Sequence, residues 1–314
     1  MRTSPLRWVA TAALTLSVAA TAACGGDPLS SGGGGGNGDP NSIIVGSANF
    51  PESEIVANLY SEVLRANGFD VSEKFNIGTR EAYIPALRDG SIDVTPDYTG
   101  NLLQYLDKEA TSTAPDDVDT DLNAALGTDL GIAKPAPAED KDAVVVTKET
   151  ADRWQLKTIA DLAPHSSDVK FGAPAEFQER AVGLPGLKKN YGLDVSPGNF
   201  VPIADGGGPA TIEALASGQV TAADIFTTTP AIKARNFVVL EDPKNNFPAQ
   251  NVVPVIRVDK KTQKLVKVLN SLSAKLTTPE LFALNEEVSG DAKTEPKDAA
   301  KAWITKQGLD KPLG

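Results

Sequence analysis

The sequence predicts an α/β protein built from two similar lobes that share a cleft. Strands and helices alternate along residues 42–95, which indicates an open parallel sheet with helices on its faces. A faint internal repeat also relates residues 86–99 to residues 214–227, and residues 43–50 to residues 169–177. The two echoes follow in the same order, so each lobe offers a similar loop. A cleft between two lobes usually holds a ligand.

The first lobe begins with an apolar, β-branched segment. Pro51 then opens a helix that has acids in its first turn and an apolar stripe at helical spacing. Alternating residues indicate the next strand, and Gly90 ends a second helix. We therefore expect strands at residues 42–47, 69–77 and 92–95, and helices at residues 51–66 and 80–88.

Residues 171–225 repeat the alternation of strands and helices, and the chain then returns to the first lobe. Residues 143–147 read as a strand that leads out of the first lobe, and residues 251–257 as a strand that comes back to it. Two crossings, near residues 147 and 250, predict a hinge. We assign residues 42–147 and 250–314 to lobe I and residues 148–249 to lobe II. The tail should hold helices at residues 260–276, 279–285 and 297–307.

The first 23 residues have the layout of a secretory signal, because Arg2 and Arg7 precede an apolar run and small residues. Cys24 follows, and it is the chain's only cysteine. Its position resembles a bacterial lipoprotein processing site; the alternative is a secreted protein with an incidental cysteine. Residues 24–41 are rich in glycine and would form a flexible tether. We expect a lipid-anchored protein on the outer face of the cell membrane.

Composition excludes several classes of function. A formal net charge of −11 argues against a nucleic-acid partner. His165 is the only histidine and reads as a surface loop residue. Since Cys24 lies outside the expected fold, no Cys/His pair is available, and no serine-hydrolase elbow or zinc-protease helix occurs. Asp93 and Asp97 read as turn and cap residues rather than an acid/base pair, and residues 206–208 as a tight turn that caps the helix at residues 210–217. We expect no catalysis, cofactor or metal.

Three stretches together carry a resemblance: Val45-Gly-Ser-Ala-Asn-Phe50, Gly90-Ser-Ile-Asp-Val-Thr-Pro-Asp-Tyr-Thr-Gly100 and Gly183-Leu-Pro-Gly-Leu187. They resemble the osmoprotectant-binding proteins of ABC importers, which bind glycine betaine, carnitine or choline. The likeness runs over nearly all of residues 42–312. It implies a two-lobed periplasmic-binding-protein fold of type II, which closes over a small ligand, acts as a monomer and delivers the ligand to a membrane permease.

The resemblance also implies a site. Such proteins hold a quaternary ammonium in an aromatic cage. Tyr98 matches a cage position, Phe226 stands where the family usually has Tyr, and Arg180 matches the carboxylate-binding Arg. Other positions depart from the pattern: Asn101 replaces a Thr, and Gln250 or Asn251 replaces an aromatic residue. The candidate ligand-binding residues are Tyr98, Phe226, Arg180, Asn101, Arg80, Thr227, Gln250 and Asn251.

These departures leave alternatives open. At most two cage walls remain, so the protein is either a weak betaine binder or a binder of another polar solute, such as an amino acid or a sugar-like compound. Arg80 lies at a helix start and either faces the cleft or forms a surface salt bridge. A secreted enzyme using Asp93 or Asp97, and a structural lipoprotein with no ligand, are weaker hypotheses. The leading prediction is capture of a small zwitterion or quaternary amine such as glycine betaine.

Overall fold

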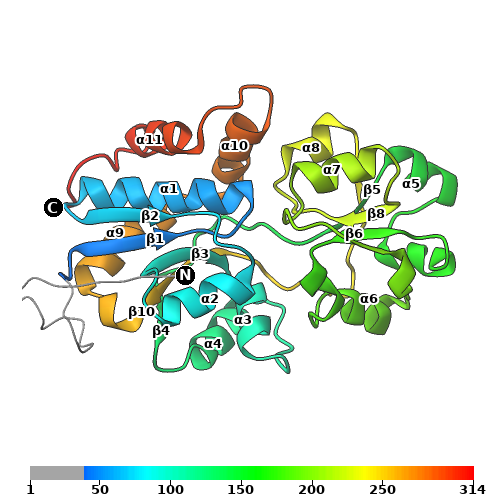
Figure 1. Ribbon diagram of the computed structural model, residues 1–314, viewed down its shortest axis with the longest axis horizontal. Helices are drawn as coiled ribbons and strands as arrows, with labels where there is room; N and C mark the ends of the chain where they lie inside the picture. The colour runs from blue at the N-terminus through cyan, green and yellow to red at the C-terminus, as the bar shows by residue number, and fades with distance from the viewer. Residues whose placement is uncertain (1–38) are drawn as a thin grey trace, which may run out of the picture. The chain divides into compact units, whose positions relative to one another are not determined.

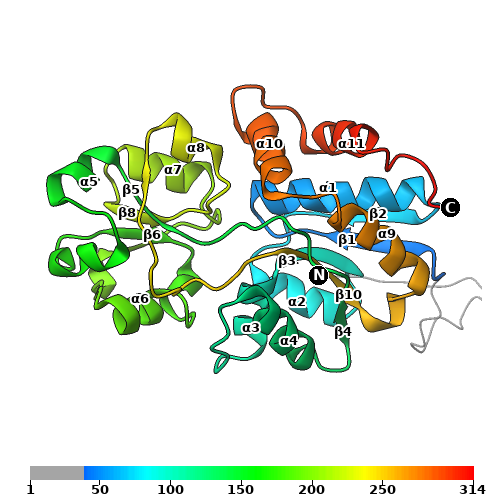
Figure 2. The same cartoon turned by 180° about the vertical axis from the view of Figure 1, so that it is seen from behind.

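The computed structural model describes residues 39–314, which fold around two five-stranded sheets (Figures 1 and 2). The predicted signal segment, Cys24 and all of the tether before residue 39 lie outside the described residues. The strands are β1 (Ser42–Gly46), β2 (Asp70–Lys74), β3 (Val94–Tyr98), β4 (Leu130–Ile132), β5 (Val144–Val146), β6 (Phe171–Ala173), β7 (Phe200–Pro202), β8 (Ala222–Asp224), β9 (Val238–Val239) and β10 (Val252–Arg257).

The first sheet has the strand order β2-β1-β3-β10-β4. Strands β1, β2 and β3 are parallel to one another, as the alternation of strands and helices predicts. Strand β10, from outside residues 42–95, pairs antiparallel with both β3 and β4, so the sheet as a whole is mixed. The reason is that β10 arrives from the second lobe and not from a crossover helix on this sheet.

The second sheet has the order β7-β6-β8-β5-β9, with β6 parallel to its two neighbours and β5 antiparallel to β8 and β9. Strand β5 therefore belongs to this sheet, and the assignment of residues 144–147 to lobe I is wrong. The first crossing lies before Val144. The two crossing segments touch each other where Glu139 and Asn251 form an isolated antiparallel bridge.

Helices cover both faces of each sheet (Figures 1 and 2). One apolar core of the first lobe joins its sheet to α1, α9, α10 and α11, and a second core joins it to α2, α3 and α4. In the second lobe α5 and α6 cover one face and α7 and α8 the other. The bounds are α1 Pro51–Ala66, α2 Arg80–Arg88, α3 Thr99–Leu106, α4 Pro115–Ala125, α5 Lys148–Trp154, α6 Leu184–Tyr191, α7 Pro209–Ala216, α8 Pro230–Ala234, α9 Gln263–Ser273, α10 Thr278–Ser289 and α11 Pro296–Lys306.

Strand ends carry the residues that meet between the lobes. The repeat seen in the sequence corresponds to β1 and β6 for one echo, and to β3 and β8 for the other. Since the carboxyl ends of strands in open α/β sheets form the ligand crevice, the loops after these strands are placed to build a site. Within residues 39–314 no helix has the length and apolarity needed to cross a bilayer.

Candidate ligand-binding cleft

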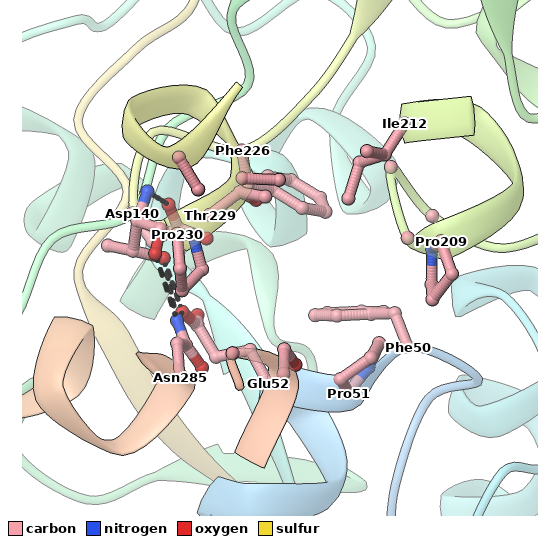
Figure 3. Close-up of a pocket in the computed structure, with 18 of the residues that line it drawn as sticks. Phe50, Pro51, Glu52, Asp140, Pro209, Ile212, Phe226, Thr229, Pro230 and Asn285 are labelled. Carbon is pink, nitrogen blue, oxygen red and sulfur yellow. Dashed lines mark hydrogen bonds between the residues drawn. The ribbon is translucent and has the colours of Figure 1, made fainter. Parts of the chain in front are cut away.

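A cavity of about 470 Å³ lies between residues of the two lobes (Figure 3). Its first-lobe wall comes from the start of α1 and the end of α10, and its second-lobe wall from the loop before α7 and the loop between β8 and α8. A cavity of this volume fits a small ligand. Residues that line it include Phe50, Glu52, Asp140, Gly206, Ile212, Phe226, Thr228, Arg235, Asn285 and Lys293.

Three aromatic rings pack against one another beside this cavity, and we call them the aromatic trio: Phe50, Tyr98 and Phe226. Phe50 and Phe226 line the cavity, whereas Tyr98 is buried next to them and does not line it. Phe50 follows β1 and precedes α1, Tyr98 ends β3, and Phe226 follows β8. The Phe226 ring lies 5.3 Å from the Phe50 centroid and 6.1 Å from the Tyr98 centroid, and it stacks on Tyr98 at an interplanar angle of 13°. The two echoed loops therefore do present matched aromatic faces, and Figure 3 shows Phe50 and Phe226 facing each other across the cavity.

Glu52 ties the aromatic trio to both lobes. Its carboxylate is only 6% exposed, and it accepts hydrogen bonds from the Tyr98 hydroxyl at 2.5 Å and the Thr228 hydroxyl at 2.5 Å. The side-chain amide of Asn285 in α10 donates a third. Burial, followed by the charge of Glu52, raises the pKa of Tyr98 well above its usual range, so that Tyr98 remains a hydrogen-bond donor.

Asp140 is a second buried carboxylate on the same wall. Its Oδ1 accepts from the Thr228 backbone N–H at 2.9 Å and from the Thr227 hydroxyl at 3.1 Å. Burial, followed by the nearby charge of Glu52, raises the pKa of Asp140 well above its ordinary value. No ion pair within residues 39–314 involves either carboxylate. The cavity thus combines aromatic faces with negative charge.

The predicted residue Arg80 lines a smaller pocket of about 200 Å³, together with Asn101 and Arg180. The Arg80 guanidinium holds the Asp97 carboxylate through contacts of 2.6, 3.1 and 3.2 Å, and the Tyr83 hydroxyl donates to the same carboxylate at 2.9 Å. Arg80 is 7% exposed and Asp97 is fully buried. The alternative of a surface salt bridge is therefore wrong, because this pair belongs to the interior.

Arg180 has a looser arrangement in the same pocket. Its guanidinium pairs with Glu81 at 3.1 Å, across the two lobes, and the two side chains are 25% and 40% exposed. Next to this pair, the Thr79 hydroxyl donates to Glu176 at 3.2 Å. Unlike Arg80, Arg180 can exchange its partner for a ligand carboxylate without leaving a fully buried charge alone.

Asn101 and Gln250 form a buried amide network. The Asn101 side chain donates to Asp142 at 2.6 Å, and the Asn101 backbone N–H donates to the Gln250 side-chain carbonyl at 3.0 Å. Gln250 also donates to Asp142 at 3.2 Å, and it is fully buried. Burial, followed by the charge of Asp142, raises the pKa of nearby Asp224. This network ties α3 to both crossing segments.

The two remaining predicted residues lie apart from each other. Thr227 donates to Asp140 and accepts from the Lys141 backbone N–H at 3.0 Å, next to the large cavity. Asn251 donates from its side chain to the Ala136 carbonyl at 3.0 Å, while its backbone N–H donates to the Thr99 hydroxyl. Asn251 thus joins the crossing segments and lines neither pocket.

Of the predicted residues only Phe226 lines the large cavity, and the residues that the prediction missed include Phe50, Glu52, Asp140 and Asn285. Phe50 carried a signal, because it ends the first echoed segment. Glu52 reads as an ordinary acid in the first turn of a helix, which is a common and sufficient role for it. Asp140 and Asn285 reach the site from a crossing segment and from α10, and no local pattern marks them.

The ion pairs of Asp93 and Asp97 bear on the hypothesis of a secreted enzyme. Asp93 pairs with Arg257 at 2.9 Å and Asp97 with Arg80, so each carboxylate has a cationic partner and the two do not form an acid/base pair. The turn at residues 206–208 does precede α7, whose first N–H groups donate to Asp205 at 2.6 and 3.2 Å. Among residues 39–314, no cluster of three or more His, Cys, Asp and Glu could hold a metal ion.

Comparison with known proteins gives consistent matches over most of the chain. The family described as "Substrate binding domain of ABC-type glycine betaine transport system" matches residues 41–306. The chain is 27% identical over 279 residues to the glycine betaine-binding protein YehZ of Escherichia coli (strain K12), which covers 85% of this chain and 91% of the relative. It is 28% identical to the ergothioneine transport permease/ergothioneine binding protein EgtU of Helicobacter pylori (strain G27), covering 85% of this chain and 48% of that longer protein.

A solved structure gives the same result. The crystal structure of a glycine betaine/carnitine/choline ABC transporter protein superposes with a TM-score of 0.66 at 25% identity, over 85% of this chain and 99% of that one. Two mixed sheets with flanking helices, as seen here, are the two-lobed arrangement of periplasmic binding proteins. The predicted fold class is thereby confirmed.

Proposed function

This chain belongs to the family of substrate-binding domains of ABC-type glycine betaine transport systems, and we propose that it captures a small solute that carries a cationic nitrogen group. Substrate-binding proteins of ABC importers act outside the cytoplasm and work with a permease. In this chain, the cationic group would lie in the large cavity, against the aromatic trio, and closure of the lobes would bury it.

The observation that carries this proposal is the placement of three aromatic rings beside two buried carboxylates that have no cationic partner within residues 39–314. A cation on an aromatic face gains about 0.5–2 kcal/mol per contact. A buried carboxylate without a cation pays a desolvation cost that a bound cation would relieve. We propose that Phe50 supplies a further aromatic face for the cation.

The opposite end of the ligand would meet the smaller pocket. Tyr98 ends β3, and Asn101 lies three residues further on, in the first turn of α3, where it lines the smaller pocket. We propose that a zwitterion extends from the aromatic trio toward Arg180. We propose that Arg180 exchanges Glu81 for the ligand carboxylate and binds it through paired donors. Thr227 and Asn101 would border the path between the two ends.

The remaining parts of the proposal concern the setting of the protein. We propose that Cys24 carries a lipid, that residues 24–41 tether the two lobes, and that the protein acts as a monomer without catalysing a reaction. The supporting features are the signal-like first 23 residues, the glycine-rich composition of the tether and the similarity to transport proteins. Mass analysis of the membrane-extracted protein, compared with a Cys24→Ser variant, tests the anchor.

A second candidate is a different polar solute in the same transport role. The smaller pocket favours it, because Asn101, Gln104 and Arg180 offer hydrogen-bonding groups in place of further aromatic walls. Mass spectrometry of ligand released from the purified protein distinguishes a cationic amine from a neutral solute.

Isothermal titration with glycine betaine, choline and carnitine tests the leading proposal. We expect saturable binding of at least one of the three. Absence of binding by all three at millimolar concentration would exclude this class of ligand and leave the transport role standing on the family alone.

A further inference from the structure

We propose that Glu52 and Asp140 share one proton while the cavity is empty, and that a cation entering the cavity displaces this proton into solution. Ligand capture would then be coupled to proton release, and affinity would rise with pH. The inference rests on the proposed function, because it assigns the anionic partner of the ligand and the control of that same site.

The geometry joins the two carboxylates through one residue. The Thr228 hydroxyl donates to Glu52 Oε2 at 2.5 Å, and the Thr228 backbone N–H donates to Asp140 Oδ1 at 2.9 Å. The residues are 6% and 1% exposed, so water screens neither charge effectively. Asp140 Oδ2 is buried and has no hydrogen-bond partner within residues 39–314, so this oxygen is free to carry the proton.

A second buried polar atom beside Glu52 and Asp140 also lacks a hydrogen-bond partner within the described residues. Asn285 Oδ1 also has no partner within the described residues, although Asn285 is 5% exposed and lines the same cavity. Its Nδ2 atom already donates to Glu52. Figure 3 shows Asp140, Glu52 and Asn285 grouped at one end of the cavity, with the Phe226 ring beside them. A bound cation would bring positive charge to all of these oxygens.

The charged surroundings decide how the pair is neutralised. Burial, followed by the nearby charge of Glu52, raises the pKa of Asp140, which makes Asp140 the carboxyl that holds the proton while the cavity is empty. Arg235 lines the cavity and pairs with Glu213 at 3.1 Å, and Lys141, next to Asp140 in the chain, pairs with Glu139 at 3.4 Å. Lys293 and Asp291 also line the cavity, and neither forms an ion pair with Glu52 or Asp140 within the described residues. The uncharged groups that face the pair are Tyr98, Thr227, Thr228 and Asn285.

The exchange of one bound proton for one bound cation balances in charge. In the empty site one proton lies between two carboxylates, which together carry one negative charge. When a cation binds on the aromatic trio, its charge stabilises the second carboxylate, and the proton leaves to the buffer. Choline is a suitable probe because neither its ammonium nor its hydroxyl titrates near neutral pH, so any released proton comes from the protein.

Calorimetric titration of the purified protein with choline, at one pH in two buffers that differ in heat of protonation, measures the proton directly. We expect the apparent binding heat to differ between the buffers by an amount equal to release of up to one proton per choline. Affinity should rise by about tenfold per pH unit below the pKa of the pair. Identical heats in the two buffers with pH-independent affinity would overturn the proposal.

The variant Asp140→Asn keeps the acceptor for Thr228 and removes the shared proton. It should abolish both the buffer dependence and the pH dependence. The matched control is Asp152→Asn, at an exposed carboxylate that pairs with Lys148 on α5, and it should change neither. Buffer dependence that survives Asp140→Asn would overturn the assignment of the proton to this pair.

A measurement without ligand separates this inference from the proposed function. Since the folded protein holds a proton that the unfolded chain releases near pH 4, the stability of the empty protein should fall as pH rises from about 4 through the raised pKa of the pair. Asp140→Asn should flatten this fall. If choline does not bind but the fall is present, the proposed ligand is wrong and the shared proton stands. If the wild type and the variant have the same pH profile, the shared proton is wrong.

Discussion

Replacing Arg80 by Met tests whether this arginine serves the fold or the ligand. Its guanidinium makes contacts of 2.6–3.2 Å with both oxygens of Asp97, and the Arg80 and Asp97 side chains are 7% and 0% exposed. The substitution keeps most of the aliphatic volume and removes the charge. Asp97 would keep the Tyr83 hydroxyl and the Tyr98 backbone N–H as donors, but it would have no cation.

The size of the effect follows from this burial. Breaking a buried ion pair by removing one partner typically costs about 3–5 kcal/mol, because it leaves an uncompensated charge. At about 2–4 °C per kcal/mol for a chain of this size class, the melting temperature should fall by roughly 6–20 °C. The matched variant Arg180→Met breaks a pair whose side chains are 25% and 40% exposed, so it should cost only about 0–1 kcal/mol.

Urea denaturation gives the stability of each variant, and titration gives its affinity for glycine betaine and choline. We expect Arg80→Met to lower the stability more than Arg180→Met does. Arg180→Met should weaken the binding of glycine betaine and leave the binding of choline, which lacks a carboxylate, nearly unchanged. The reasoning would be refuted by the reverse result, in which Arg80→Met leaves stability within about 1 kcal/mol of wild type and selectively weakens the carboxylate ligand.

Two further variants test the cleft itself. Phe226→Ala should weaken choline binding by about 2- to 30-fold, because one cation–π contact is lost, whereas Phe226→Tyr should change the affinity little. A calorimetric titration measures both variants. If Phe226→Ala binds choline as tightly as the wild type does, the cation lies elsewhere. Gly206→Ala puts a Cβ about 3.1 Å from the Cβ of Phe50 on a backbone with φ of +59°, so it should reduce both stability and choline affinity. Gly218→Ala, with φ of +75° and nothing within 4 Å, should reduce stability alone, and a similar loss of affinity in both alanine variants would count against the contact with Phe50.

Local patterns in the sequence predicted the elements well, because local rules govern them. Helix α2 spans Arg80–Arg88 as predicted, and α1 begins at Pro51 with its acids in the first turn. The position of β5 could not be predicted in this way. An apolar run of three valines fits either sheet, and its pairing with β8 and β9 is decided by contacts far along the chain.

The residues of the candidate site also divide into those that the sequence pattern identifies and those that it does not. The repeat identified Tyr98 and Phe226, because each follows a strand in an echoed segment, and their rings do stack. Asp140 and Asn285 could not be found from sequence, since they come from elements of different type and their roles arise only where Glu52 and Thr228 meet. Gln250 and Asn251 were chosen as substitutes for missing aromatic walls, yet their hydrogen bonds link α3 and the crossing segments.

The central claim is that the cleft recognises positive charge. It is tested most directly by titrating the protein with choline and with 3,3-dimethyl-1-butanol, in which a carbon replaces the ammonium nitrogen and the shape is kept. We expect choline to bind at least about tenfold more tightly, since the cation–π attraction and the attraction to the Glu52–Asp140 pair act only on the charged compound. Equal binding of the two compounds would contradict it.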